Sequence, residues 1–237
     1  MNSRQWRRNS LNNWTEAQGP RETTMNANID LWIAELLTSR LCHDIVGPIG
    51  AVNNGLELMA DDELGMADDA LQLATRSSAQ ATLLLQFFRL AYGSAGHHES
   101  GDLAALRELA ADFLSHHKAS LEWLPDPALV SLPGGTGKLL LNLVALAAEA
   151  LPRGGSVTLV LRPEGNDVLV EATLQGVDAG FRPEVEEGLA EGISPDELTP
   201  RNIHGYFTRL VARRLGGDLA IEPLSPSSLR FSVILPA

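Results

Sequence analysis

Two long stretches of apolar residues at helical spacing constrain the fold of this chain most strongly. Apolar side chains recur mostly every three or four residues from 31 to 59, and again from 71 to 92. This spacing places them on one face of a helix. Residues 60–65, between the two stretches, form a short acidic segment that ends in glycine. We therefore predict two long helices that pack as an antiparallel hairpin.

A hairpin by itself leaves half of its apolar stripe exposed to water. Burying one such side chain is worth roughly 1.5–3 kcal/mol, so a second copy of the hairpin is the simplest cover. We predict a homodimer in which two hairpins form a four-helix bundle with two-fold symmetry. The predicted stripe consists of Leu41, Ile45, Val52, Leu56, Leu84 and Phe88.

The first helix also carries a histidine, His43, directly before an acid, Asp44. At about 100° per residue, the side chain of His43 lies roughly 200° from Leu41 and Ile45, so it points away from the stripe. The residues that share its direction are Leu36, Gly47, Gly50 and Asn54. Glycine weakens a helix by roughly 1 kcal/mol relative to alanine. A partner surface that must approach the histidine closely would explain the two glycines.

Pro48 lies five residues after His43 in the same helical pattern. Proline has no amide to donate to the carbonyl of Asp44, so we expect a kink just past His43. An alternative role for the two glycines is to ease this kink.

After a glycine-rich segment at 93–101, which we interpret as an interdomain linker, helix and strand patterns alternate. Helical patterns cover 102–117, 138–150, 184–189 and 203–215, and strand patterns cover 120–123, 157–162, 167–174, 219–222 and 229–235. The last four strands are expected to pair as two hairpins. Helices on one face of a mixed sheet would form an α+β sandwich.

The composition argues against several functions. The 237 residues are 44% hydrophobic with a formal net charge of −12, which disfavours nucleic-acid binding. The single cysteine, Cys42, rules out a disulfide framework and fits a reducing compartment. No apolar run approaches the roughly 18 residues of a membrane span, and none follows the early arginines as in a secretory signal. We expect a cytoplasmic protein, away from membranes, with residues 1–28 disordered.

The residues around His43 resemble those of known signalling proteins. The His-Asp-x-x-x-Pro pattern at 43–48 resembles the H-box of two-component histidine kinases, in which the histidine carries a phosphoryl group. The longer stretch 40–58 is similar to the ChpT-type histidine phosphotransferases of alphaproteobacteria, and the similarity runs from about residue 30 to the C-terminus. It implies a dimerisation and phosphotransfer hairpin at 29–96 and a degenerate kinase-like α/β domain at 97–237.

The second domain resembles the ATP-binding domain of histidine kinases but lacks residues that bind nucleotide there. Asn142 matches the start of their N-box, yet Leu146 stands where they have a magnesium-binding asparagine. A leucine cannot ligate a cation that requires oxygen. The aspartate of the adenine-binding turn is displaced to Asp178, and only residues 202–205 replace the glycine-rich lid. We expect neither ATP binding nor any cofactor held by this chain.

The resemblance implies an enzyme that moves a phosphoryl group from a receiver aspartate to His43 and then to a second receiver. Neutral imidazole is a competent nucleophile near pH 7, and Asp44 would orient the ring or accept a proton. Arg40 would either neutralise phosphate charge or be a solvated helix residue. The predicted docking surface for the receiver is Gly47, Gly50 and Asn54.

The resemblance also implies the partners. The donor would be the receiver domain of a hybrid kinase of the CckA type, and the acceptor a cell-cycle response regulator of the CtrA type. Magnesium would come with the acidic pocket of the receiver rather than from this chain.

Two other classes of function stay open. An active ATP-dependent histidine kinase would need a working nucleotide site. A scaffold that binds receivers without chemistry would be unaffected by the loss of His43.

Two further patterns suggest sites that we do not expect. Residues 134–138 resemble a P-loop, but leucines occupy 132 and 139, where that motif requires glycine and Ser or Thr. We interpret them as a glycine-rich turn before a helix. The pairs His97–His98 and His116–His117 lack further ligands at useful spacing, so a zinc site is not expected.

Overall fold

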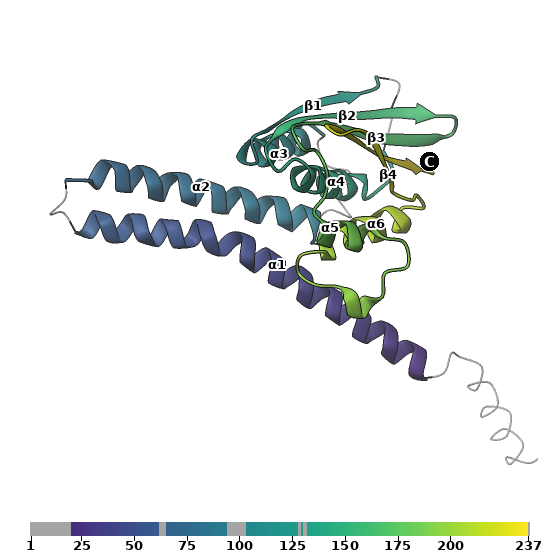
Figure 1. The fold of residues 1–237 in the computed structure, drawn as a ribbon, viewed down its shortest axis with the longest axis horizontal. Helices are drawn as coiled ribbons and strands as arrows, with labels where there is room; N and C mark the ends of the chain where they lie inside the picture. Colours follow the sequence, from purple (N-terminus) through teal and green to yellow (C-terminus); the bar gives the residue numbers. More distant parts are fainter. Residues whose placement is uncertain (1–19, 62–64, 94–102, 128, 130–131, 237) are drawn as a thin grey trace, which may run out of the picture.

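The computed structural model describes residues 20–61, 65–93, 103–127, 129 and 132–236. Helix α1 spans Pro20–Ala60 and α2 spans Ala67–Ala91. They lie side by side as the predicted antiparallel hairpin (Figure 1).

Helix α1 begins earlier than the sequence suggested. Residues 20–28, predicted to be disordered, belong to this helix. Proline is well tolerated in the first turn of a helix, where its missing amide needs no partner. No glycine or further proline follows within that segment to stop the helix. The rest of the predicted disordered tail, residues 1–19, and most of the predicted linker, residues 94–101, lie outside the described residues.

Small residues allow the two helices to approach closely. Gly55 of α1 is buried, and a Cβ added there would lie 2.8 Å from the carbonyl oxygen of Ala70. The facing residues of α2 are also small and buried: Ala70, Ala74, Ser77 and Ala81. The helices therefore meet with little side-chain volume between them along this half of the hairpin.

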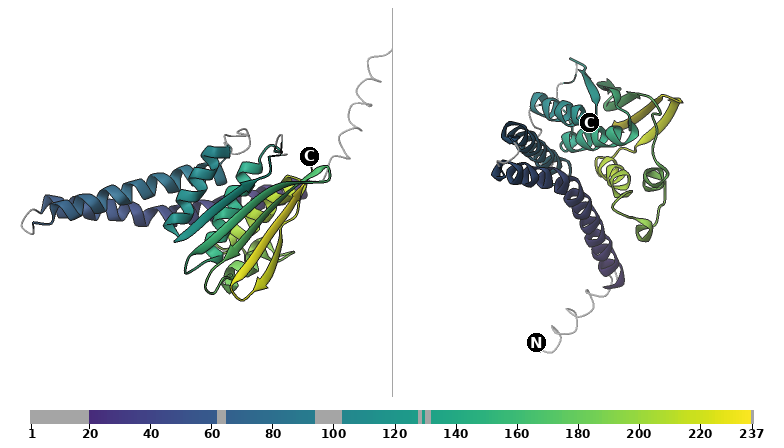
Figure 2. Two further views of the ribbon diagram at one scale, coloured as in Figure 1. Left: turned by 90° about the horizontal axis from the view of Figure 1, so that it is seen from above. Right: turned by 60° about the vertical axis from the view of Figure 1, so that its left-hand side comes forward.

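The second domain is the predicted α+β sandwich. Its strands are β1 (Ala119–Pro125), β2 (Gly155–Glu164), β3 (Asp167–Gln175), β4 (Ala220–Ser225) and β5 (Ser228–Leu235). They form one sheet in the order β1-β2-β3-β5-β4, in which only the β1–β2 pair is parallel. Its helices are α3 (Leu103–His116), α4 (Thr136–Ala150), α5 (Pro183–Leu189), the short 3-10 helix η3 (Pro195–Glu197) and α6 (Ile203–Arg214). They lie on one face of the sheet, which the views of Figure 2 confirm.

The C-terminal end of α2 is part of the core of the second domain. The rings of Phe87 and Phe113 stack with centroids 3.8 Å apart, which joins α2 to α3. Helix α4, whose Leu139, Leu140 and Leu141 are fully buried, completes the same hydrophobic cluster. The two domains therefore share one core rather than being connected by a linker alone.

This shared core changes the prediction for the dimer stripe. Leu84 and Phe88 are buried within the protomer, and Leu41 and Ile45 pack partly against the same cluster. They are covered by this chain's own second domain. The prediction missed this because helical spacing shows that a face is buried without showing what buries it. The large apolar side chains of the hairpin that stay exposed between Ile49 and Leu85 are Ile49, Leu56, Leu58, Met66, Leu71, Leu73 and Leu85.

Candidate functional site

His43 projects from the middle of α1 into solvent. Its side chain is 87% exposed, and its Nδ1 lies 3.2 Å from Oδ1 of Asp44. An ionised carboxylate can only accept a hydrogen bond, so in the neutral imidazole this contact places the proton on Nδ1. The other ring nitrogen, Nε2, is then unprotonated and available as a nucleophile.

The helix that carries His43 is not straight. Figure 1 shows the axis of α1 bending between the part that runs beside α2 and the part that continues past the second domain. Pro48 lies inside this helix, and its missing amide removes one helical hydrogen bond. A bend in this helix agrees with the kink expected from Pro48.

Arg40 is neither solvated nor free. Its guanidinium Nη2 lies 2.5 Å from Oε1 of Glu149 on α4, and only 19% of its side chain is exposed. The same Glu149 oxygen lies 2.7 Å from Nδ1 of His204 on α6. Three elements that are far apart in the sequence are therefore joined at one carboxylate, which is only 12% exposed.

The charge of Glu149 is maintained by its two partners. Burial by itself would raise the pKa of Glu149, but His204 and Arg40 outweigh burial and hold that pKa below its usual value. Glu149 is therefore ionised at neutral pH.

The sequence analysis did not identify Glu149 or His204 as site residues. The available signal was a single charged side chain in the stretch 139–151, in which the only other polar side chain is that of Asn142.

The segment in the place of the kinase lid packs against α1. Ile203 and Leu198 form a second hydrophobic cluster with Ile33 and Leu36 of α1. The indole Nε1 of Trp32 donates a hydrogen bond to the carbonyl of Pro195, at 3.2 Å. The face of α1 that His43 shares with Leu36 is thus covered at Leu36, on the N-terminal side of the histidine, and is exposed to solvent at His43.

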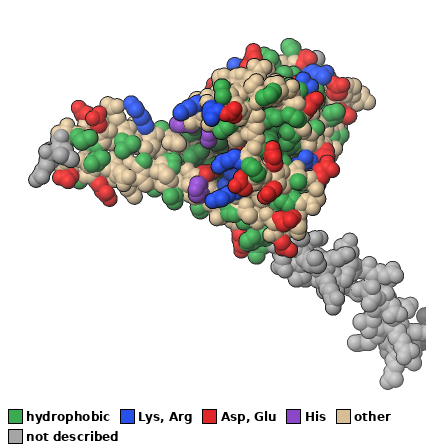
Figure 3. Space-filling model, viewed as in Figure 1, with side chains coloured by type: hydrophobic (Ala, Val, Ile, Leu, Met, Phe, Trp, Pro, Cys, Tyr) green, Lys and Arg blue, Asp and Glu red, His purple; other side chains and the backbone are tan. Residues whose placement is uncertain are grey.

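Two clefts meet beside His43. The first, of about 950 Å³, lies between α1 and the second domain and is bordered by His43, Arg182 and Arg201. The second, of about 670 Å³, lies among α1, α2, α3 and α4 and is bordered by Tyr92 and Lys118. Both are lined by Arg40, Asp44, Glu149 and Arg182. Figure 3 shows a hollow at the junction of the hairpin and the second domain, with basic and histidine side chains at its edge.

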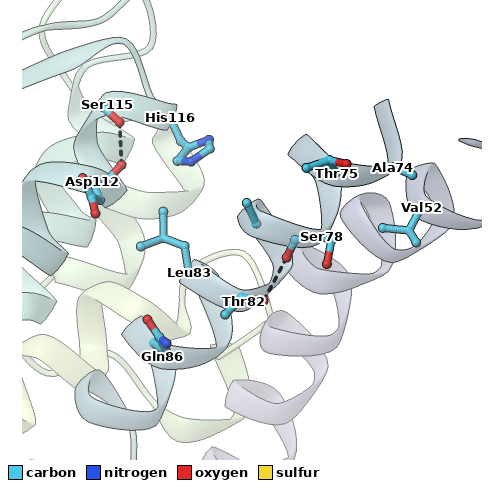
Figure 4. Close-up of a pocket in the computed structure, with 11 residues that line it drawn as sticks. Val52, Ala74, Thr75, Ser78, Thr82, Leu83, Gln86, Asp112, Ser115 and His116 are labelled. Carbon is cyan, nitrogen blue, oxygen red and sulfur yellow. Dashed lines mark hydrogen bonds between the residues drawn. The ribbon is translucent and has the colours of Figure 1, made fainter. Parts of the chain in front are cut away.

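A third hollow, between α2 and α3, does not include His43. It is lined by residues such as Ser78, Thr82, Asp112 and Ser115 (Figure 4). The hydroxyls of Thr82 and Ser115 donate to backbone carbonyls of their own helices. These two hydroxyls are satisfied locally, so they do not point to a ligand.

The predicted docking residues lie on an open part of α1. A Cβ added at Gly47 or at Gly50 would meet no atom within 4 Å, and Asn54 is exposed. Close packing within the protomer therefore does not require either glycine. Both proposed reasons for these glycines, partner approach and the Pro48 kink, remain compatible with the structure.

The residues in nucleotide-site positions are engaged in the fold. Leu146 is fully buried in the hydrophobic core. Asp178 lies on the surface and pairs with Arg153. The amide of Asn202 bonds the backbone within its own turn, accepting from the amide of Thr199 at 2.7 Å. Leu146 offers no oxygen ligand, and the side chains of Asp178 and Asn202 have polar partners within the protein.

The P-loop-like segment is a helix start, as predicted. Gly135 is the N-cap of α4 and has a φ of 89°, which glycine adopts without strain. Lys138 donates to the carbonyls of Tyr92 and Gly93 at the end of α2, at 3.0 and 3.1 Å. This lysine therefore ties α4 to the hairpin.

The described part of the chain contains no group of three or more His, Cys, Asp or Glu side chains able to hold a metal ion. The pair His97–His98 lies outside the described residues. Within the described ranges, no helix is both long and apolar enough to cross a membrane.

Comparison with known proteins identifies the family. The protein phosphotransferase ChpT of Brucella abortus (strain 2308) is 35% identical over 195 residues, which cover 80% of this chain and 90% of the relative. The chain belongs to the ChpT-type histidine phosphotransferases. The family model for the histidine phosphotransferase C-terminal domain matches residues 103–225 of this ChpT-type chain.

A solved structure agrees with this membership. A bacterial phosphotransferase solved at 1.7 Å is 34% identical and superposes with a TM-score of 0.74, covering 86% of this chain and 96% of its own. The chain is thus a histidine phosphotransferase of a two-component phosphorelay. The comparisons do not favour either alternative, the ATP-dependent kinase or the non-catalytic scaffold.

Proposed function

We propose that His43 carries the phosphoryl group between receiver aspartates. Its Nε2 attacks the phosphorus of an aspartyl phosphate, an N–P bond forms, and the P–O bond to the aspartate breaks to release a carboxylate. The observation that supports this role is a histidine 87% exposed whose Nδ1 is 3.2 Å from the Asp44 carboxylate. Asp44 stabilises the positive charge that develops on the ring. Transfer of labelled phosphate from a phosphorylated receiver to the His43→Gln variant tests this assignment.

The reverse reaction passes the phosphoryl group to a second receiver. The carboxylate of that receiver attacks phosphohistidine, and the N–P bond breaks to regenerate neutral imidazole. Magnesium is supplied by the receiver, so the chain needs no cofactor of its own. The donor is the receiver domain of a hybrid kinase of the CckA type. The acceptor is a cytoplasmic response regulator of the CtrA type that acts in the cell cycle.

The receiver docks on Gly47, Gly50 and Asn54 of α1 and also contacts the second domain. The cleft beside His43 is bordered by Arg182 and Arg201, whose guanidinium groups suit a phosphate-bearing partner, and also by Glu184, Glu187 and Glu197. Arg40 is held by Glu149, so its contribution to phosphate binding is electrostatic rather than a direct contact.

The chain forms a homodimer through the hairpin. Ile49 and Leu56 of α1, and Leu71 and Leu85 of α2, are each about half exposed at 46%, 53%, 50% and 51%. Within each helix the two residues are separated by multiples of seven, so they point in nearly the same direction. A second hairpin would cover them.

Leu85→Asp is expected to convert the dimer to monomers without unfolding the protein, because Leu85 is outside the protomer's core. Light scattering at micromolar concentration should show the mass halved. Val177→Asp, which changes an exposed residue of the second domain, should leave the mass unchanged. Leu84→Asp should instead unfold the protomer, since Leu84 is buried in its core. A wild-type protein that is strictly monomeric would contradict the dimer.

Calorimetric titration with Mg-ATP is expected to show no saturable heat at millimolar concentration. The reason is that Leu146 is buried where a metal-binding asparagine would be needed, and a leucine offers no oxygen ligand. Titration of the same sample with a receiver domain serves as the positive control. Micromolar affinity for Mg-ATP would favour the kinase alternative.

A further inference from the structure

We infer that Glu149 and His204 of the second domain are positioning residues for His43, acting through Arg40 and Asp44. This inference rests on the proposed role of His43 and gives the second domain a part in the chemistry, beyond docking the receiver.

A line of polar contacts with one long step connects the two domains. His204, only 1% exposed, lies 2.7 Å from Glu149, and Glu149 lies 2.5 Å from Arg40. Nε of Arg40 lies 3.9 Å from Asp44, and Asp44 lies 3.2 Å from His43. The line therefore runs from a buried histidine of α6 to the exposed histidine of α1.

The weak point of this line is the gap between Arg40 and Asp44. Arg40 and Asp44, four residues apart on α1, form an ion pair, but its Nε–Oδ2 distance of 3.9 Å is too long for a hydrogen bond. The Nε of Arg40 is buried and has no hydrogen-bond acceptor among the described residues. We attribute the length of the Arg40–Asp44 contact to Glu149, which binds the other end of the guanidinium.

Glu149 is held in this role by His204. The contact with His204 fixes the Glu149 carboxylate toward α1, and the lowered pKa of Glu149 keeps it charged at neutral pH. The other ionisable groups near Arg40 include Asp44, Tyr92 and His117. Burial raises the pKa of the Tyr92 phenol, so it stays neutral, and burial lowers the pKa of His117. Glu149 is thus the anion that competes with Asp44 for Arg40.

This competition decides which partner Asp44 has. With Arg40 on Glu149, the Asp44 carboxylate accepts from Nδ1 of His43 and leaves Nε2 as the nucleophile. Without the charge of Glu149, the guanidinium would turn to Asp44, because charge-assisted contacts of arginine with carboxylates are strong and often bidentate. The charge of the Asp44 carboxylate would then be shared between Arg40 at Oδ2 and His43 at Oδ1, which weakens the acceptor that selects the tautomer of His43.

The test compares the tautomer of His43 in three proteins by nitrogen-15 NMR of the ring. The wild type should carry its proton on Nδ1, and Glu149→Gln should give a mixture of tautomers. The double variant Arg40→Met/Glu149→Gln should return to the wild-type tautomer, because no guanidinium remains to capture Asp44. Phosphotransfer by Glu149→Gln should fall roughly tenfold, the scale on which partners that orient a functional histidine act.

Glu171→Gln is the matched control, since it removes the carboxylate of a sheet ion pair with Arg230, at 3.7 Å. It should change neither the tautomer nor the rate. If Glu149→Gln keeps the wild-type tautomer, or if the double variant fails to restore it, the inference is wrong. A purely structural role for Glu149 would make the double variant no better than the single one.

A second measurement covers the case in which Glu149→Gln does not fold. Arg40→Met alone leaves Glu149 paired with His204, and the tautomer of His43 should stay as in the wild type. A shift in this variant would overturn the inference. NMR tests whether Glu149 controls the tautomer of His43, and the transfer assay tests whether His43 is the phosphoacceptor. Failure of one claim is therefore distinguishable from failure of the other.

Discussion

Replacing His43 with glutamine abolishes phosphotransfer from a phosphorylated receiver, with an expected loss of at least roughly a thousandfold, as when an essential nucleophile is removed. A glutamine amide has no nucleophilic nitrogen. The fold should not change, because the side chain of His43 is 87% exposed and, among the described residues, Asp44 is its one hydrogen-bonding partner. Surface substitutions of this kind usually alter stability by no more than about 0.5 kcal/mol.

The measurement is the rate at which labelled phosphate moves from receiver to protein, with thermal unfolding followed in parallel. His116→Gln is the control, since that histidine is also exposed and borders the adjacent cleft; it should transfer normally. Normal transfer by His43→Gln would remove His43 from the reaction. Normal relay between two receivers without any labelled intermediate would favour the scaffold alternative.

Placing tryptophan at Gly50 blocks transfer from the receiver while leaving the protein folded. The phosphorus must come within about 3–3.5 Å of the histidine nitrogen, and a misplacement of roughly 1 Å can reduce a rate about a hundredfold. An indole at position 50 projects into open space rather than into the protomer, because a Cβ there meets no atom within 4 Å. The steric conflict therefore arises only when a receiver docks.

The control is Ala79→Trp, which adds the same bulk at an exposed position of α2. Folding and dimer mass should be normal in both variants, and only Gly50→Trp should lose transfer and receiver binding. Wild-type transfer by Gly50→Trp would show that the receiver binds elsewhere. The glycines would then serve to ease the bend at Pro48.

The local features of this fold were predictable from the sequence. Apolar spacing predicted the hairpin and every helix and strand of the second domain, with bounds that differ by a few residues; the exceptions were the early start of α1 and the short η3. The same spacing predicted that His43 points away from the buried stripe. These predictions succeed because helical and strand periodicity depends on residues that are close in the chain.

The surroundings of the site were not predictable in this way. Arg40 was expected to bind phosphate or to be solvated, but it is paired with Glu149, 109 residues away. Leu84 and Phe88 were expected at a dimer interface, but they are buried by the second domain. Leu84 and Phe88 were correctly placed on a buried helix face. For them and for Arg40, the partner came from a different part of the chain.

The sequence by itself determined the secondary structure, the phosphotransfer motif around His43 and the absence of a metal ligand at Leu146, because each depends on residue type and short-range spacing. Only the tertiary structure decided what covers each helix face and which carboxylate Arg40 binds. Those outcomes depend on how a shared core brings α1, α4 and α6 together. No spacing along one helix encodes a contact with another.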